Sequence, residues 1–238
     1  MLYLDFPSPL HRVALADALR DLQAGDNAIG VILVGSLSRG NARPDSDIDL
    51  IVVHERGERS GGRRAYGNIE VEFIARTAES WTEQFCPSAA GDESWGYAFL
   101  EGVILHDPRG IAAQLREQAG KSHAGYHVPG EIVEHFVSLW KHVLPKLRDL
   151  LRGGDNVEIG WSAAVMTHPV IQTLWAANDL PLPSLDIGCL QRRLDDITVP
   201  ANAPQSVREM VQASPQRALE LQVSLLEAVV PLLEDQLK

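Results

Sequence analysis

Hydrophobic and polar positions along the first half of the chain change repeatedly between a strand-like and a helical period. Residues 9–25 carry apolar side chains every three to four positions, which predicts an amphipathic helix that begins after Ser8 and ends at Gly25. Short apolar or alternating runs bounded by polar residues predict four strands, at 28–34, 47–54, 69–74 and 103–106. Further helices are expected between and after these strands, at 77–85, 94–101 and 107–120.

The second half of the chain has a helical pattern, which begins after a change of composition at 121–129. Residues 130–152 and 157–178 predict helices, the second interrupted near Pro169. A proline-rich connector follows, and 205–236 form an amphipathic stretch in which breaks are expected at Pro215 and Pro231. The order of elements predicts an α+β fold: a mixed α/β domain with a small mixed sheet at 1–122, then an all-helical domain at 123–238.

Two carboxylates on the second predicted strand are the most informative feature of the chain. Asp47 and Asp49 alternate with Ile48, so on a strand they project from the same face. Neighbouring carboxylates repel each other, and a divalent metal ion is the usual compensation. The Gly35-Ser36 turn after the first strand offers backbone N–H groups and a hydroxyl to a phosphate. Together they predict phosphoryl or nucleotidyl transfer. The alternative is an ordinary turn with solvated Asp side chains.

The same residues carry a family resemblance. Gly35-Ser36, Arg39-Gly40 and Ser46-Asp47-Ile48-Asp49-Leu50 resemble the signature of the DNA polymerase β-type nucleotidyltransferase superfamily, in particular its bacterial aminoglycoside and minimal nucleotidyltransferases. The resemblance implies that Asp47 and Asp49 bind Mg²⁺, with two ions in the site, and that a nucleoside triphosphate such as ATP is the substrate. It also implies a nucleotide-binding role for Gly35, Ser36, Arg39 and Ser46, although Arg39 could equally form a surface salt bridge.

A third carboxylate is expected on the third strand. The superfamily pattern places an acid between two apolar residues there, and both Glu70 and Glu72 meet that description. We expect Glu70 to be the third metal ligand and the general base, because Ile69-Glu70-Val71 aligns better with the antibiotic-modifying branch. Glu72 is the alternative. An acceptor hydroxyl would then attack the α-phosphorus in line, and pyrophosphate would leave.

A polar, glycine-rich loop is predicted at 55–64, between the two strands that carry the acids. It contains four arginines, Arg56, Arg59, Arg63 and Arg64. Such a loop could close over a triphosphate or a charged acceptor, but a charge run of this kind is more often a solvated, mobile loop.

Composition narrows the partners and the location. The chain has 238 residues, of which 45% are hydrophobic and 22% charged, as in soluble globular proteins. Its net charge of -11 disfavours a long nucleic-acid substrate, because proteins that grip such substrates normally carry a basic stripe. Cys86 and Cys189 lie far apart and indicate a cytoplasmic protein without disulfides. We expect neither a signal peptide nor a membrane-spanning helix.

Three functions compete on this basis. The first is a Mg²⁺-dependent enzyme that transfers a nucleoside monophosphate from a nucleoside triphosphate to a hydroxyl of a small acceptor, such as an antibiotic. The second is an antitoxin-type enzyme that nucleotidylates a partner protein. The third is a non-catalytic nucleotide-binding protein. The acceptor, the preferred nucleobase and the oligomeric state are not encoded in any motif of the sequence.

Overall fold

The computed structural model describes residues 4–25 and 27–238, which fall into two compact units. Unit 1 contains the described residues up to Phe85 together with Trp95–Ala124. Unit 2 contains Cys86–Ser94 and Gly125–Lys238. The segment Cys86–Ser94 therefore packs with the second half of the chain, although it lies within the first half of the sequence. The domain boundary expected between residues 122 and 123 stays a prediction.

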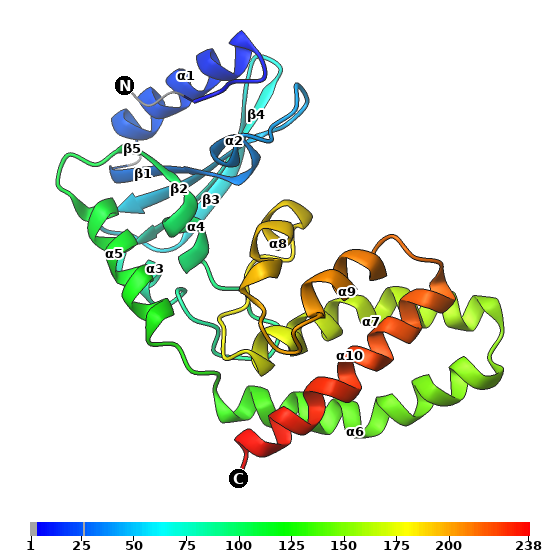
Figure 1. Cartoon of the computed structure of the whole chain (residues 1–238). Helices are drawn as coiled ribbons and strands as arrows, with labels where there is room; N and C mark the ends of the chain where they lie inside the picture. The colour runs from blue at the N-terminus through cyan, green and yellow to red at the C-terminus, as the bar shows by residue number, and fades with distance from the viewer. Residues whose placement is uncertain (1–3, 26) are drawn as a thin grey trace. The chain divides into compact units, whose positions relative to one another are not determined.

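A five-stranded mixed sheet forms the centre of unit 1 (Figure 1), with strand order β3-β4-β2-β1-β5. β2 and β4 are parallel, whereas β1 pairs antiparallel with β2 and β5, and β3 pairs antiparallel with β4. The strands are β1 (Ala28–Val34), β2 (Ile48–His54), β3 (Ser60–Tyr66), β4 (Ile69–Thr77) and β5 (Val103–His106). The predicted mixed α/β architecture of this half is confirmed.

Helices cover both faces of the sheet because each face is apolar over most of its area. On one face α1 (Pro9–Gly25) buries Leu15 and Leu22 against β1, β2 and β4. The other face buries Trp81 and Phe99, together with apolar side chains of α5, against β1 and β2. The helices on that face are α3 (Ala78–Thr82), α4 (Gly96–Glu101) and α5 (Ile111–Ala124). Capping fixes where two of them begin. Thr77 Oγ1 accepts from the Ser80 N–H in α3, and Asp107 accepts from two N–H groups of α5.

The prediction of a loop at 55–64 is wrong for residues 60–64, because residues 60–66 form strand β3. Its arginine- and glycine-rich sequence is typical of a loop, but β4 provides a complete antiparallel partner from Ser60 to Tyr66. The two strands are joined by Gly67-Asn68, a two-residue hairpin connection in which Gly67 has a φ of 63°. This dipeptide is the sequence signal that the loop prediction overlooked.

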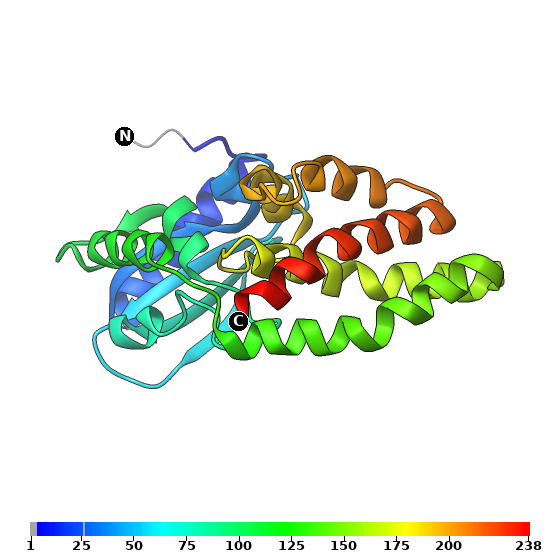
Figure 2. The same ribbon diagram turned by 60° about the horizontal axis from the view of Figure 1, so that its bottom comes forward.

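Three long helices, α6, α7 and α10, form the framework of unit 2, and α10 packs against both α6 and α7 (Figure 2). The predicted all-helical character of this half is confirmed. The helical elements are α6 (Gly130–Gly153), α7 (Asn156–Ala177), α8 (Ile187–Arg193), the 3₁₀ helix η1 (Leu194–Asp196), α9 (Ala203–Met210) and α10 (Pro215–Gln236). Inside the core, Trp140 Nε1 donates a 2.7 Å hydrogen bond to Thr173 Oγ1, and both residues are buried.

Prolines divide this half less than the sequence predicts. Pro215 begins α10, but Pro169 and Pro231 lie inside continuous helices, so the breaks expected there are wrong. A proline within a helix costs about 3 kcal/mol. α7 and α10 each bury many apolar side chains, and each fully buried Leu or Val contributes roughly 1.5–3 kcal/mol, so packing outweighs the local penalty. In the part of the chain that the structure describes, no helix is both long and apolar enough to cross a bilayer.

Candidate functional site

Three carboxylates converge where β2 and β4 run side by side in unit 1. Asp47 immediately precedes β2, Asp49 is its second residue, and Glu72 of β4 is the register partner of Asp49. Each of the three residues offers one oxygen that lies within 4.8 Å of the other two. All three side chains are half-buried. We call Asp47, Asp49 and Glu72 the acid group.

The acid group has the right ligand chemistry for Mg²⁺. Carboxylate oxygens are the hard donors that this ion prefers, and two oxygens bound to one Mg²⁺ are at most about 4.2 Å apart. The three oxygens of the acid group lie within 4.8 Å of one another, so the group is compact enough for them to approach one ion. Like charges at this spacing also repel, which favours a cation between them.

Glu70, the residue expected from the sequence as third acid, lies outside this group. It stands on the same face of β4 as Glu72 but two residues earlier, where its register partner is Ala65 of β3. Its carboxylate is 3.0 Å from Arg63. The alternation of β4 alone cannot separate Glu70 from Glu72, because both point to one face. The parallel register with β2 places Glu72 beside Asp49.

Arg63, on the neighbouring strand β3, lies on the same sheet face as Glu70 and Glu72 and contacts both. Its Nη1 is 3.0 Å from Glu70 Oε1 and its Nη2 is 2.9 Å from Glu72 Oε2. The negative charges of Glu72 and, next, Glu70 raise the pKa of the Arg63 guanidinium above its ordinary value. Arg63 was expected in a loop; instead the β3–β4 pairing holds it directly opposite Glu72.

The Gly35-Ser36 turn lies against the acid group. Val34, the last residue of β1, is the register partner of Asp49, so the chain turns beside that carboxylate. Gly35 has a φ of 69°, and a Cβ at this position would overlap the Asp49 carboxylate, with 2.8 Å to Cγ. Only glycine combines this backbone conformation with so close an approach.

Ser36 lies in the first turn of the short helix α2 (Gly35–Arg39), which ends at a left-handed Gly40. Its side chain is half-buried, as is that of Arg39 at the last position of α2. The chain thus turns at Gly35 beside the Asp49 carboxylate, and Ser36 is the next residue of this turn.

A buried histidine fixes the residue before Asp47. His11 of α1 is fully buried, with Nε2 3.0 Å from the Ser46 carbonyl oxygen and Nδ1 2.8 Å from Ser8 Oγ. Because a carbonyl can only accept, Nε2 carries the hydrogen and Nδ1 accepts from the serine hydroxyl. Ser46 Oγ also accepts from the Arg43 N–H at 2.8 Å. Sequence reasoning missed His11, since one histidine in a helix gives no signal of its partner.

Another arginine of the predicted loop, Arg64, lies away from these acids. Arg64 points to the opposite face of β3 from Arg63, where its guanidinium lies 4.8 Å from the centre of the Phe73 ring. Glu55, at the start of the connection from β2 to β3, is 2.8 Å from Arg109, and that contact lowers the pKa of the Glu55 carboxyl. Arg63, by contrast, forms ion pairs with two acids of β4, Glu70 and Glu72.

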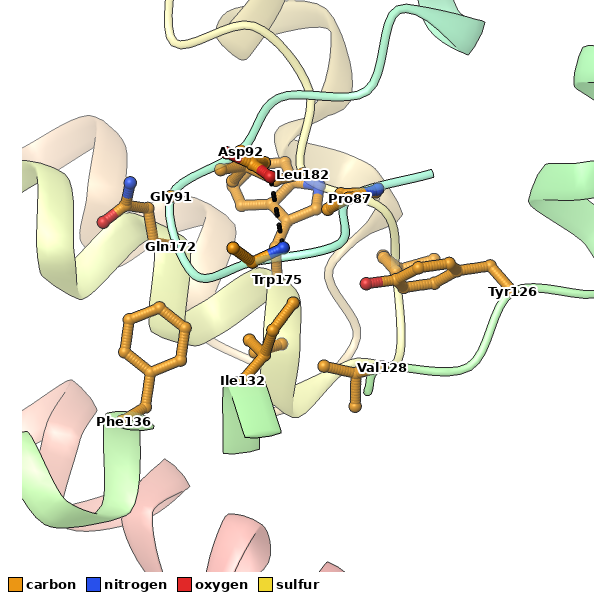
Figure 3. A pocket seen from close by; sticks show the side chains of 13 residues that line it. Pro87, Gly91, Asp92, Tyr126, Val128, Ile132, Phe136, Gln172, Trp175 and Leu182 are labelled. Carbon is orange, nitrogen blue, oxygen red and sulfur yellow. Dashed lines mark hydrogen bonds between the residues drawn. The ribbon is translucent and has the colours of Figure 1, made fainter. Parts of the chain in front are cut away.

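Unit 2 contains a separate small pocket (Figure 3). Tyr126 and Trp175 lie among its lining residues; burial raises the pKa of the Tyr126 hydroxyl to about 12, and Trp175 Nε1 is buried without a hydrogen-bond partner among the described residues. The cavity has a volume of about 20 Å³, far below the roughly 300–1,000 Å³ typical of ligand sites. It is a weaker candidate for substrate binding than the acid group. Its other lining residues are Pro87, Ala89, Gly91, Asp92, Val128, Ile132, Phe136, Gln172, Ala176, Leu180 and Leu182.

A comparison with known protein families agrees with the chemistry of the acid group. Residues 14–85 match the family described as "Nucleotidyltransferase domain". This segment includes the Gly-Ser turn, β2 and β4, and therefore the whole acid group. No curated protein matches the sequence significantly. Among solved structures, a nucleotidyltransferase-like protein from Exiguobacterium sibiricum 255-15 is similar, with 14% identity, a TM-score of 0.45, and coverage of 95% of this chain and 75% of that one.

Proposed function

We propose that residues 14–85, which match a nucleotidyltransferase domain, form a domain of the polymerase β-type superfamily, and that the chain transfers a nucleoside monophosphate from a nucleoside triphosphate to a hydroxyl of a small acceptor. The reaction belongs to the EC 2.7.7 class. We further propose that it depends on Mg²⁺, with Asp47, Asp49 and Glu72 as ligands. The observation that most supports the proposal is the convergence of these carboxylates beside the Gly35-Ser36 turn, within the matched segment.

Each residue of the site has a part in the proposed reaction. Bound Mg²⁺ supplies Lewis acidity and neutralises the charge that develops on the triphosphate. The hydroxyl of Ser36 and the backbone N–H groups of its turn hold the terminal phosphates. A carboxylate on β4 accepts the proton of the acceptor hydroxyl, for which Glu72 is our choice and Glu70 the alternative. Asp47 and Asp49 would hold the ion together with Glu72.

Charge supports a small acceptor over a long nucleic acid. The net charge of -11 opposes binding of a polyanion and suits a cationic acceptor, the class to which aminoglycosides belong. We also propose that the site binds two metal ions, as related two-metal enzymes do. We further propose that the protein is cytoplasmic.

The test is release of pyrophosphate from each of the four nucleoside triphosphates with Mg²⁺ and a panel of hydroxyl-bearing acceptors. We expect turnover in the wild type and none above background in a variant that combines Asp47→Asn and Asp49→Asn. Asp45→Asn is the matched control, because this exposed residue lies two positions before Asp47 and outside the acid group. Wild-type turnover in the double variant would refute the assignment.

A protein acceptor of the antitoxin type is the second candidate. One observation favours it: Val157, Trp161 and Val165 are exposed at i, i+4 and i+8 on α7, with exposures of 79%, 74% and 45%. An apolar stripe of this kind commonly marks a protein contact. The mass of a candidate partner protein, measured after incubation with the enzyme and a triphosphate, would rise by one nucleotide residue. An unchanged mass while small acceptors react would exclude this candidate.

A further inference from the structure

One row of side chains crosses four strands of the unit 1 sheet and ends in a cation. Arg63 of β3 is the register partner of Glu72, Glu72 is the partner of Asp49, and Asp49 is the partner of Val34. Register partners lie on one face of a sheet. The guanidinium of Arg63 and the acid group therefore share one face, with Glu72 between them.

Glu72 has two competing roles in this row: it pairs with Arg63 and it belongs to the acid group. Its Oε2 accepts from Arg63 Nη2 at 2.9 Å, and the residue also contributes one of the three oxygens of the acid group. Glu70 holds the other arm of the same guanidinium at 3.0 Å. Arg63 thus spans two carboxylates, as a positive charge at the edge of a negative cluster.

We propose that Arg63 is a resident counter-cation that competes with the divalent ion for Glu72, while Glu70 holds Arg63 in place. The proposal rests on the metal site proposed above. Binding of a divalent ion would weaken the Arg63–Glu72 ion pair in two ways. A divalent ion in the acid group repels the guanidinium, and it draws the Glu72 carboxylate away from the ion pair. An exposed ion pair contributes little, so Arg63 weakens the binding of the metal without preventing it.

The competition couples the metal to the nucleotide. A triphosphate brings negative charge that offers Arg63 a new partner when Glu72 turns to the ion. Nucleotide binding then removes the competitor, so it tightens the binding of the metal, and by linkage the metal tightens the binding of the nucleotide. Arg63 is a positioning residue in this scheme, acting on the ion through Glu72.

The experiment measures binding of Mn²⁺ by the full chain, with and without a non-hydrolysable ATP analogue, from the electron paramagnetic resonance signal of free Mn²⁺. Without nucleotide, Arg63→Gln should lower the Kd for Mn²⁺ roughly two- to fivefold, the size expected of one exposed charge pair. With the analogue present this gain should disappear. Arg63→Lys keeps the charge and should bind Mn²⁺ much as the wild type does.

Arg64→Gln is the matched control, because it removes the same charge from the same strand but on the face that carries Phe73. Relative to the wild type, the Kd for Mn²⁺ should change less in Arg64→Gln than in Arg63→Gln. An equal change in both variants, or weaker Mn²⁺ binding in Arg63→Gln, would overturn the proposal. If wild type and Asp49→Asn bind Mn²⁺ alike, the metal site itself fails and both proposals fall. If only the Arg63 effect is missing, the metal site stands.

Discussion

Unit 1 and unit 2 differ in what their polar side chains do. In unit 2, buried polar groups such as the Trp140 N–H and the Thr173 hydroxyl bond each other inside an apolar core. In unit 1, Asp47, Asp49 and Glu72 gather on one sheet face, where their charges repel. The first arrangement contributes stability, whereas the second leaves a repulsion that Arg63 offsets at Glu72 and that a bound divalent ion would relieve further. The difference is between polar groups that stabilise a core and carboxylates arranged to bind a cation.

The largest effect that would test this contrast is loss of activity without loss of fold. Asp49→Asn removes one of the proposed metal ligands, so pyrophosphate release should fall about 10³-fold or more. The free energy of unfolding should change by about 1 kcal/mol or less, since no core packing is lost. Urea denaturation alongside the kinetic assay checks both values. If Asp49→Asn lost activity only because it unfolded, the contrast between a binding role for the acid group and a packing role for the core of unit 2 would be wrong.

The opposite result is expected in the core of unit 2. Trp140→Ala removes a fully buried ring and its bond to Thr173, and should lower the free energy of unfolding by about 3–5 kcal/mol. Trp161→Ala is the matched control, because that ring is 74% exposed, and it should change stability by about 0.5 kcal/mol or less. Similar stability losses in the two variants would mean that Trp140 has no special place in the core.

His11 is buried in unit 1 and also holds the residue before Asp47. Its substitution should therefore lower both stability and metal affinity, each by an intermediate amount. In His11→Leu the Ser46 carbonyl loses its donor, which should cost about 1–3 kcal/mol of stability and weaken Mn²⁺ binding at the neighbouring Asp47. His11→Gln retains an N–H that can reach Ser46, so it should restore Mn²⁺ affinity at least in part. A Leu variant with unchanged Mn²⁺ affinity would limit His11 to a packing role.

Much of this organisation could be predicted from the sequence, because it depends on local patterns. Residues 28–34 and 103–106 form strands as predicted, since short apolar runs report burial in a sheet. Asp47, Asp49 and the Gly35-Ser36 turn were placed together by the strand period and by the family signature. Gly35 in addition has a steric reason that only the structure reveals, its contact with Asp49.

The rest depends on pairing between distant segments. Strand β3 has a loop-like composition and exists because β4 provides its partner. Pro169 and Pro231 remain inside helices because tertiary packing outweighs the local cost. Neither the bond from His11 to Ser46 nor the register of Asp49 with Glu72 follows from any local pattern. For the same reason the alternation of β4 could not distinguish Glu70 from Glu72.

That register supports the central claim, and one matched pair of variants tests it most directly. Glu70→Gln and Glu72→Gln remove the same charge from the same strand face, two residues apart. We predict that Mg²⁺-dependent pyrophosphate release falls at least about 100-fold in Glu72→Gln, as for a lost metal ligand, but no more than about tenfold in Glu70→Gln. The reverse order, with Glu70→Gln the more damaged variant, would contradict the assignment of Asp47, Asp49 and Glu72 as the metal site.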